Sequence, residues 1–288
     1  MKTPRIKFTP SWSRKKLKPP KGGSLIVFPI VNVEHWVYSE PMPRTIIPPP
    51  QGGPPPAPDV PNWSWKEYGW RCGLPRMMAI FRKFGVRVTA SINGDVCNAY
   101  PEMAEAMHKD GWEFMGHGWV QTPMNKVADE RDVIRKTKQT IEAFTKKKMR
   151  GWMGPGLVET FDTADLIKEE GIEWCCDFPL DDLPFEIETK HGPLLGLPYT
   201  FELNDIVIYA VERHSSEEMY RRLTASLPIY LEETKTEPRI MVISMHPYTM
   251  GVPHRIGWCH RMFEELSRLP GVVYMTGSEI ADWYLAQV

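Results

Sequence analysis

The sequence has little net charge and no long apolar run. Its 35 basic and 36 acidic side chains leave a formal charge of −1, so it lacks the basic surface expected of a protein that binds nucleic acid or an anionic membrane. No apolar stretch approaches the ~18 residues that a membrane-spanning helix requires. The basic N-terminus also lacks the apolar segment of a secretory signal.

Cysteines are few, and the motifs of nucleophilic catalysis are missing. The five cysteines form no C-x-x-C pair, and their odd number and irregular spacing do not suggest a disulfide framework. A reducing cytoplasm is therefore the simpler expectation. No G-x-S-x-G turn occurs, and no cysteine has an evident histidine partner in the sequence. What remains is an ordinary globular composition with 42% hydrophobic residues, enough for a large core.

Two segments depart from the regular pattern of the chain. Residues 1–23 are rich in Lys, Arg and Pro, which indicates an extended arm over the domain or a neighbouring subunit, or else a frayed tail. The main domain is expected at 24–288. Within it, residues 41–61 hold so many prolines that helix and central strand are both disfavoured. Because this insertion follows the polar end of the first strand, we favour an active-site loop over a disordered linker.

Strands and helices alternate about seven times along the main domain, without an internal repeat. This pattern predicts a parallel α/β sheet, either closed into a barrel or open and doubly wound. The expected strands cover residues 24–33, 87–93, 113–116, 172–177, 195–199, 206–209, 239–245 and 272–274. The expected helices cover residues 68–84, 100–109, 129–146, 163–170, 215–231, 254–266 and 277–286. Pro228 is expected to kink or end the fifth of these helices.

Polar side chains stand where several of the expected strands end. Glu34 follows the first strand, His117 lies in a bendable Gly-His-Gly turn, and Asp177 and His246 end two later strands. In parallel α/β enzymes such strand ends meet at one edge and build the active site. Carboxylates and imidazoles can activate water and protonate a leaving nitrogen, so the set predicts the acid–base site of an amide-cleaving hydrolase. Taken singly, each acid could cap a helix and each histidine could be structural.

Further side chains could line a pocket beside these groups. Arg255 could hold an anionic or carbonyl group, and Trp36, Trp119 and Trp152 each follow a polar strand end. Indoles in such places can contact a ligand, although tryptophans more often pack in a core.

Zinc is a second possible use of Glu34 and His117. It requires three or four His, Cys or carboxylate ligands, and the position where a second histidine would complete H-x-x-x-H is Gln121, a poor zinc ligand.

Six segments carry a recognisable set of motifs: Val31-Asn32-Val33-Glu34, His117-Gly118-Trp119-Val120-Gln121, Arg150-Gly151-Trp152-Met153-Gly154-Pro155-Gly156, Asp177 with Asp181-Asp182-Leu183-Pro184, His246-Pro247 with Gly251-Val252-Pro253-His254-Arg255, and Thr276 to Trp283. Together they resemble the polysaccharide deacetylase, or NodB-homology, superfamily, and within it the branch of metal-independent allantoinases and cyclic-imide hydrolases. The resemblance covers about residues 24–286. It implies that residues 24–288 form a distorted seven-stranded (β/α) barrel with catalytic function.

The resemblance also has departures that bear on the chemistry. Metal-dependent members bind their ion with one Asp and two His, which correspond here to Glu34, His117 and Gln121. The position of their catalytic-base aspartate is Asn32, and an amide does not titrate. The Asn-x-Glu and His-Gly-Trp features are shared with the allantoinase-like members, in which an N-terminal arm helps to build a homotetramer.

The residues and the resemblance together predict a cytoplasmic hydrolase of non-peptide C–N bonds that acts on a small cyclic amide, imide or ureide. We expect no cofactor and no interaction with nucleic acid or a membrane. We expect the protein to form a homo-oligomer, either a dimer or a tetramer. Glu34 would orient or activate water, His117 and His246 would polarise the carbonyl or protonate the leaving nitrogen, and Asp177 would hold one of the histidines. The expected substrate contacts are Asn32, Trp36, Trp119, Gln121, Trp152 and Arg255.

Two other functions stay open from the sequence. One is a metal-dependent carbohydrate N-deacetylase with an altered zinc site that includes Glu34 and His117. The other is a barrel without catalytic activity that serves as a binding or assembly protein.

Overall fold

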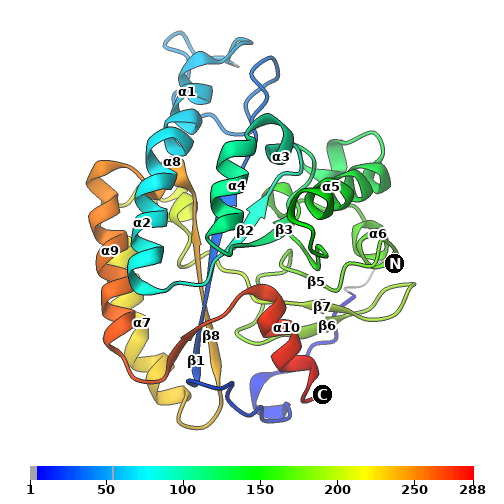
Figure 1. Ribbon diagram of the computed structural model, residues 1–288, viewed down its shortest axis with the longest axis vertical. Coiled ribbons are helices and arrows are strands. Elements are labelled where there is room, and N and C mark those ends of the chain that lie inside the picture. The colour runs from blue at the N-terminus through cyan, green and yellow to red at the C-terminus, as the bar shows by residue number, and fades with distance from the viewer. Residues whose placement is uncertain (1–4, 54) are drawn as a thin grey trace.

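The computed structural model describes residues 5–53 and 55–288. Its centre is a curled sheet with strand order β6-β7-β5-β4-β3-β2-β1-β8, and β9 pairs with β1 as well (Figure 1). Neighbouring strands are parallel except β6 and β7. The strands are β1 (Leu25–Val33), β2 (Thr89–Ile92), β3 (Glu113–Gly116), β4 (Gly151–Trp152), β5 (Trp174–Cys175), β6 (Phe185–Ile187), β7 (Leu194–Gly196), β8 (Arg239–Met245) and β9 (Val272–Tyr274).

The helices are α1 (Val60–Tyr68), α2 (Leu74–Phe84), α3 (Val96–Ala99), α4 (Pro101–Lys109), α5 (Glu130–Thr145), α6 (Thr163–Glu169), α7 (Glu218–Glu233), α8 (Pro247–Met250), α9 (Pro253–Arg268) and α10 (Gly277–Leu285). Most of them pack against the outer face of the sheet (Figure 1), whereas Ile280 and Ala281 of α10 join the core inside its curl. Gly69–Gly73 and Val207–Val211 are π-helical, and the short turns Ser11–Ser13, Met124–Lys126 and Pro155–Leu157 are 3₁₀.

The alternation of side chains along the strands separates two cores. In β1, Ile26, Phe28 and Ile30 point into the curl of the sheet, where they pack with Trp174 and Met153. The intervening residues of β1 point outward and join the larger core beneath the helices. This arrangement is the expected α/β fold of the NodB type. The sheet differs from the expected seven-stranded barrel in having nine described strands. One of them, β6, pairs antiparallel with β7 as a hairpin.

The sheet curls without a continuous ladder between its two edge strands, β6 and β8. A single backbone hydrogen bond of 3.3 Å runs from Ile240 N in β8 to Asp182 O, just before β6. The barrel is therefore a half-barrel with a seam along β8.

Three expected elements are wrong in detail. Residues 206–209 are helical rather than a strand, because Asn204 Oδ1 accepts from Ile206 N and starts a turn. The helix expected at 68–84 begins earlier, at Val60, where the Asp59 side chain accepts from Asn62 N. Pro228 does not end α7, which continues to Glu233.

The N-terminal segment lies over the domain, as one of the sequence interpretations held. Arg5 Nη1 and Nη2 donate to the carboxylate of Asp165 at 2.6 and 2.7 Å. Further along, Trp283 Nε1 donates to Lys18 O at 2.9 Å. Residues 1–4 of the expected arm lie outside the described residues.

Candidate active site

Glu34 owes its position to the alternation of β1. Asn32 and Glu34 continue the inward-facing series of even-numbered residues, so Glu34 stands just beyond the strand on the concave side of the sheet. His246 has the same place beyond β8, which pairs with β1 through residues 25–31. The strand register therefore brings these two side chains together at one edge of the sheet.

Glu34 is a buried carboxylate surrounded by donors. Trp36 Nε1 and Tyr248 Oη each donate to Oε2 at 2.8 Å, and Gln121 Nε2 donates to Oε1 at 3.1 Å. His246 Nε2 lies 3.5 Å from Oε1. Burial alone raises the pKa of Glu34, but the hydrogen bond and charge of His246, with His117 and Tyr248, outweigh it and lower the pKa to about 2. The carboxylate is therefore ionised at neutral pH.

Two glycines allow Tyr248 to reach Glu34. Gly69 and Gly73 lie in the π-helical segment that packs against α8. A Cβ at Gly69 would stand 2.3 Å from Tyr248 Cα, and one at Gly73 would stand 2.2 Å from Pro247 O. Only glycine permits this approach, which seats the Tyr248 hydroxyl over the carboxylate.

His246 is held by an acid that the sequence interpretation missed. Asp205 is fully buried, and its Oδ1 lies 2.7 Å from His246 Nδ1 while its Oδ2 accepts from His246 N at 2.8 Å. Burial lowers the pKa of His246, but Asp205 and Glu34 reverse that effect and raise it to about 9. The ring is therefore an imidazolium at neutral pH. A polar Asn-Asp pair between two apolar runs was the only sequence signal for Asp205.

His117, in contrast to His246, is an uncharged imidazole at neutral pH. Its Nδ1 lies 2.5 Å from Met153 O, and a carbonyl can only accept, so Nδ1 carries the proton and Nε2 has a free lone pair. Burial, partly opposed by Glu34, lowers the pKa of His117. Asn93 fixes this strand end, since its Nδ2 donates to His117 O and its Oδ1 accepts from His35 N.

A cleft of about 730 Å³ opens beside Glu34. Three expected contact residues line it, namely Trp36, Trp119 and Gln121. The beginning of the proline-rich stretch lines it as well, from Glu40 to Arg44, which agrees with an active-site loop at 41–61. The rest of the wall consists of Val37, Asp95, Val120, Thr122, Pro123, Lys126, Pro155 and Gly156.

Asp177 does not hold a catalytic histidine, contrary to expectation. Its Oδ1 accepts from Gly154 N at 2.6 Å, and the histidine partners in the described chain are Asp205 and Met153 O instead. Burial raises the pKa of Asp177 to about 6. Burial, and then the charge of Asp177, raise the pKa of the neighbouring Glu159 to about 10. Asp177 thus clamps the glycine-rich turn that forms one wall of the cleft.

Three expected substrate contacts lie outside the cleft lining. Trp152 points outward into the helix-side core because Met153, its neighbour, takes the inward place. Asn32 is buried in the sheet, where its Nδ2 donates to Ser244 Oγ at 3.0 Å. The Arg255 guanidinium lies 4.3 Å from the centre of the Tyr209 ring, and its Nη1 donates to Thr249 O.

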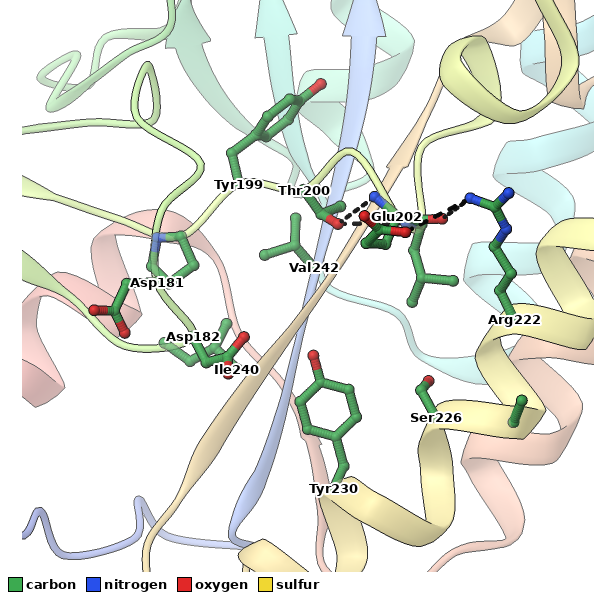
Figure 2. A pocket seen from close by; sticks show the side chains of 13 residues that line it. Asp181, Asp182, Tyr199, Thr200, Glu202, Arg222, Ser226, Tyr230, Ile240 and Val242 are labelled. Atoms are coloured by element: carbon green, nitrogen blue, oxygen red, sulfur yellow. Dashed lines mark hydrogen bonds and ion pairs between the residues drawn. The ribbon is translucent and has the colours of Figure 1, made fainter. Parts of the chain in front are cut away.

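A second cavity, of about 480 Å³, lies at the seam of the half-barrel (Figure 2). Ile240 and Val242 of β8 form its floor, and Tyr230 and Arg222 of α7 stand beside it (Figure 2). No histidine is among its lining residues in the described part of the chain, and Arg222 is engaged by Glu212 and Glu218. Of the acid–base groups, Glu34 lines the first cleft, and His246 lies next to that carboxylate.

Comparison with known proteins agrees with this geometry. Residues 67–174 match the family model "Polysaccharide deacetylase". A curated relative from Schizosaccharomyces pombe, named "Putative polysaccharide deacetylase", is 27% identical over 245 residues, which cover 77% of this chain and 75% of the relative. The middle of the chain is thus similar in sequence to polysaccharide deacetylases.

Solved structures share this fold. The crystal structure of Puue allantoinase has a TM-score of 0.82 at 20% identity, covering 95% of this chain and 94% of the other. A probable polysaccharide deacetylase from Pseudomonas aeruginosa PAO1 has a TM-score of 0.77 at 23% identity, covering 92% of each chain. At these identities the likeness establishes the fold alone.

The residues of the site do not fit the zinc that the resemblance to polysaccharide deacetylases implies. Zinc needs three or four His, Cys or carboxylate ligands. Gln121 takes the place of a histidine and donates its amide to Glu34, whose other oxygen already accepts from Trp36 and Tyr248. Within residues 5–53 and 55–288, no group of three such side chains is placed to hold an ion.

Within residues 5–53 and 55–288, no helix combines the length and the apolar character that crossing a bilayer demands.

Proposed function

We propose that the protein hydrolyses a C–N bond of a small cyclic amide, imide or ureide, without a metal. The observation that carries this proposal is the chain of contacts from Asp205 through His246 to Glu34, beside a neutral His117. It supplies an ionised carboxylate that lines the cleft, a charged acid next to that carboxylate, and an uncharged imidazole whose pKa the carboxylate influences. The structural likeness to Puue allantoinase supports the ring-opening chemistry.

In the proposed reaction, water lies between Glu34 and His117. The pKa of Glu34, about 2, makes it a weak base, so its part is to orient the water. The free Nε2 of His117 accepts the proton as the water oxygen attacks the carbonyl carbon. The charged state that results on His117 is stabilised by the negative charge of Glu34.

His246 acts as the general acid in this scheme. Its Nε2 faces Glu34 and carries a proton at neutral pH, because Asp205 holds the opposite nitrogen. Transfer of that proton to the ring nitrogen lets the C–N bond break, and the product is an acid with a free amine, amide or urea end, for a cyclic amide, imide or ureide respectively. Such a proton transfer contributes about 10²- to 10⁴-fold to a rate.

The cleft favours a small substrate over a polymer. Its volume of about 730 Å³ is in the range of small-molecule sites. The proline-rich loop lines one wall directly beside Glu34, where an extended sugar chain would have to pass. The homo-oligomer and the cytoplasmic location stay predictions from the sequence.

A hydrolysis screen of cyclic ureides, cyclic imides and acetylated amino sugars tests the proposal. We expect ring opening, lost in Glu34→Gln and in His246→Asn. Glu159→Gln is the matched control: the pKa of Glu159 is raised to about 10 by burial and by Asp177, so the amide replaces a carboxyl group that is already neutral. Turnover of acetylated sugars alone would contradict the proposal, and binding without any turnover would favour a non-catalytic protein.

A further inference from the structure

The loop that closes the cleft is fixed in place by one buried side chain. Asn62 of α1 is fully buried, and its Oδ1 accepts from Ile46 N at 2.8 Å and Ile47 N at 3.0 Å. Its Nδ2 donates to Ile47 O at 3.1 Å and to Asp59 Oδ2 at 2.8 Å. The segment just after Arg44 is therefore anchored, and Arg44 has a defined place in the cleft wall.

Arg44 is a half-buried cation in that wall. Most arginines of this chain donate to a carboxylate, as Arg150 does to Glu173 and Asp282. Arg44 has no such hydrogen bond or ion pair in the described ranges of the chain, although it is near enough to Tyr248 to lower the pKa of that hydroxyl. A guanidinium that is partly withdrawn from water without a partner is ready to bind an anion.

The acids of the cleft do not supply this anion. Glu34 is compensated by His246, with Oε1 and Nε2 3.5 Å apart. Asp95 Oδ2 lies 3.2 Å from His35 Nδ1, but burial lowers the pKa of His35, so this neutral ring leaves the charge of Asp95 in place. Lys126 adds a second positive charge to the lining. The lining thus holds three acids, Glu34, Glu40 and Asp95, and two cations, Arg44 and Lys126, and within the described ranges no ion pair joins Arg44 to any of these acids.

We propose that Arg44 forms an anion subsite that binds a carboxylate carried by the substrate. The inference rests on the proposed function and narrows it to a small cyclic amide, imide or ureide with a carboxyl substituent. The planar guanidinium can hold both carboxylate oxygens, which orients the ring and keeps the charged group away from Glu34. A neutral substrate of the same size lacks this anchor.

Titration calorimetry with succinamate and succinamide tests the subsite without any need for turnover. The two probes have nearly the same size and differ in having a carboxylate or a second amide. We expect the wild-type protein to bind succinamate more tightly, by roughly tenfold or more, and Arg44→Gln to lose that preference. Arg44→Lys should retain part of it. Arg261→Gln, which removes an exposed arginine that stacks on Trp258 outside the cleft, is the matched control for net charge.

Absence of the preference in the wild-type protein, including absence of binding by either probe, would overturn the inference. So would a preference that survives in Arg44→Gln. Kinetics on a carboxylated substrate and its neutral analogue add a second readout: we expect Arg44→Gln to raise KM for the carboxylated compound alone. An equal fall of kcat on both compounds would assign Arg44 to the reacting carbonyl and contradict the subsite. If no ring is opened at all, the proposed function fails while the binding result still decides the subsite.

Discussion

Replacement of Asp205 by asparagine is the most informative change to the site. The asparagine keeps the size of the side chain and can still accept from His246 N through its amide oxygen. It removes the negative charge that faces His246 Nδ1 at 2.7 Å. Burial then dominates, and it favours the neutral ring.

The expected magnitude follows from the pKa of His246. The difference between about 9 and the ordinary 6.5 corresponds to about 3 kcal/mol of preference for the charged ring, most of it due to Asp205. In the variant the pKa of His246 should fall to about 6.5 or lower. At a pH of about 8 the acid would be roughly nine-tenths protonated in the wild-type protein and less than one-tenth protonated in the variant.

The pH dependence of kcat/KM is the assay for this change. The wild-type profile should decline on the acid side as His117, whose pKa is lowered by burial, gains a proton, and on the alkaline side near 9, as His246 loses one. Asp205→Asn should move the alkaline limb down by about 2.5 pH units or more and leave the acid limb in place. An NMR titration of the His246 ring checks the assignment directly.

Asp177→Asn is the matched control, since it removes another buried strand-end carboxylate that accepts from Gly154 N rather than from a histidine. The alkaline limb of the kcat/KM profile of Asp177→Asn should stay near that of the wild-type protein. An alkaline limb that does not move in Asp205→Asn would refute the reasoning. Equal shifts in both variants would show that the effect comes from general electrostatics and not from the Asp205–His246 contact.

Three further predictions concern stability. The raised pKa of His246 stabilises the fold fully below its unfolded value of about 6.5, and this contribution should be lost as the pH rises through about 9, measured by urea unfolding with Asp205→Asn as the comparison. Trp152→Phe should lower the free energy of unfolding by about 1–2 kcal/mol without raising KM, because the indole packs on the helix side; a raised KM would place it in the site after all. Asn62→Ala should cost about 2 kcal/mol or more and speed proteolysis within residues 41–53, whereas the exposed Asn98→Ala should do neither; resistance of that loop to protease would contradict its anchoring by Asn62.

The sequence predicted those parts of the fold that follow from local patterns. The strands at 113–116, 239–245 and 272–274 have the bounds expected from their apolar runs. Glu34 and His246 were predicted to meet because parallel strands end at the same edge. The helical turn at 206–209 was missed, since an apolar run that short has no period that distinguishes a strand from a helix.

The errors at the site have a common physical cause. The hydrogen-bond partner that a side chain finds depends on the direction in which it points just beyond the end of its strand. Asp177 and Asp205 are both buried acids after apolar runs, yet only Asp205 reaches a histidine. Trp152 and Trp36 both follow polar stretches, yet the alternation within β4 turns Trp152 away from the cleft. Arg44 stood in a proline-rich stretch whose anchor, Asn62, could be seen only in three dimensions.

Metal content of the purified protein, measured together with ring-opening activity before and after chelation, tests the central claim most directly. The compensated Glu34 and the amide at position 121 predict substoichiometric zinc and an activity that chelator does not change. Near-stoichiometric zinc, with activity lost to chelator and restored by the metal, would contradict the account and place Glu34 and His117 in a metal site.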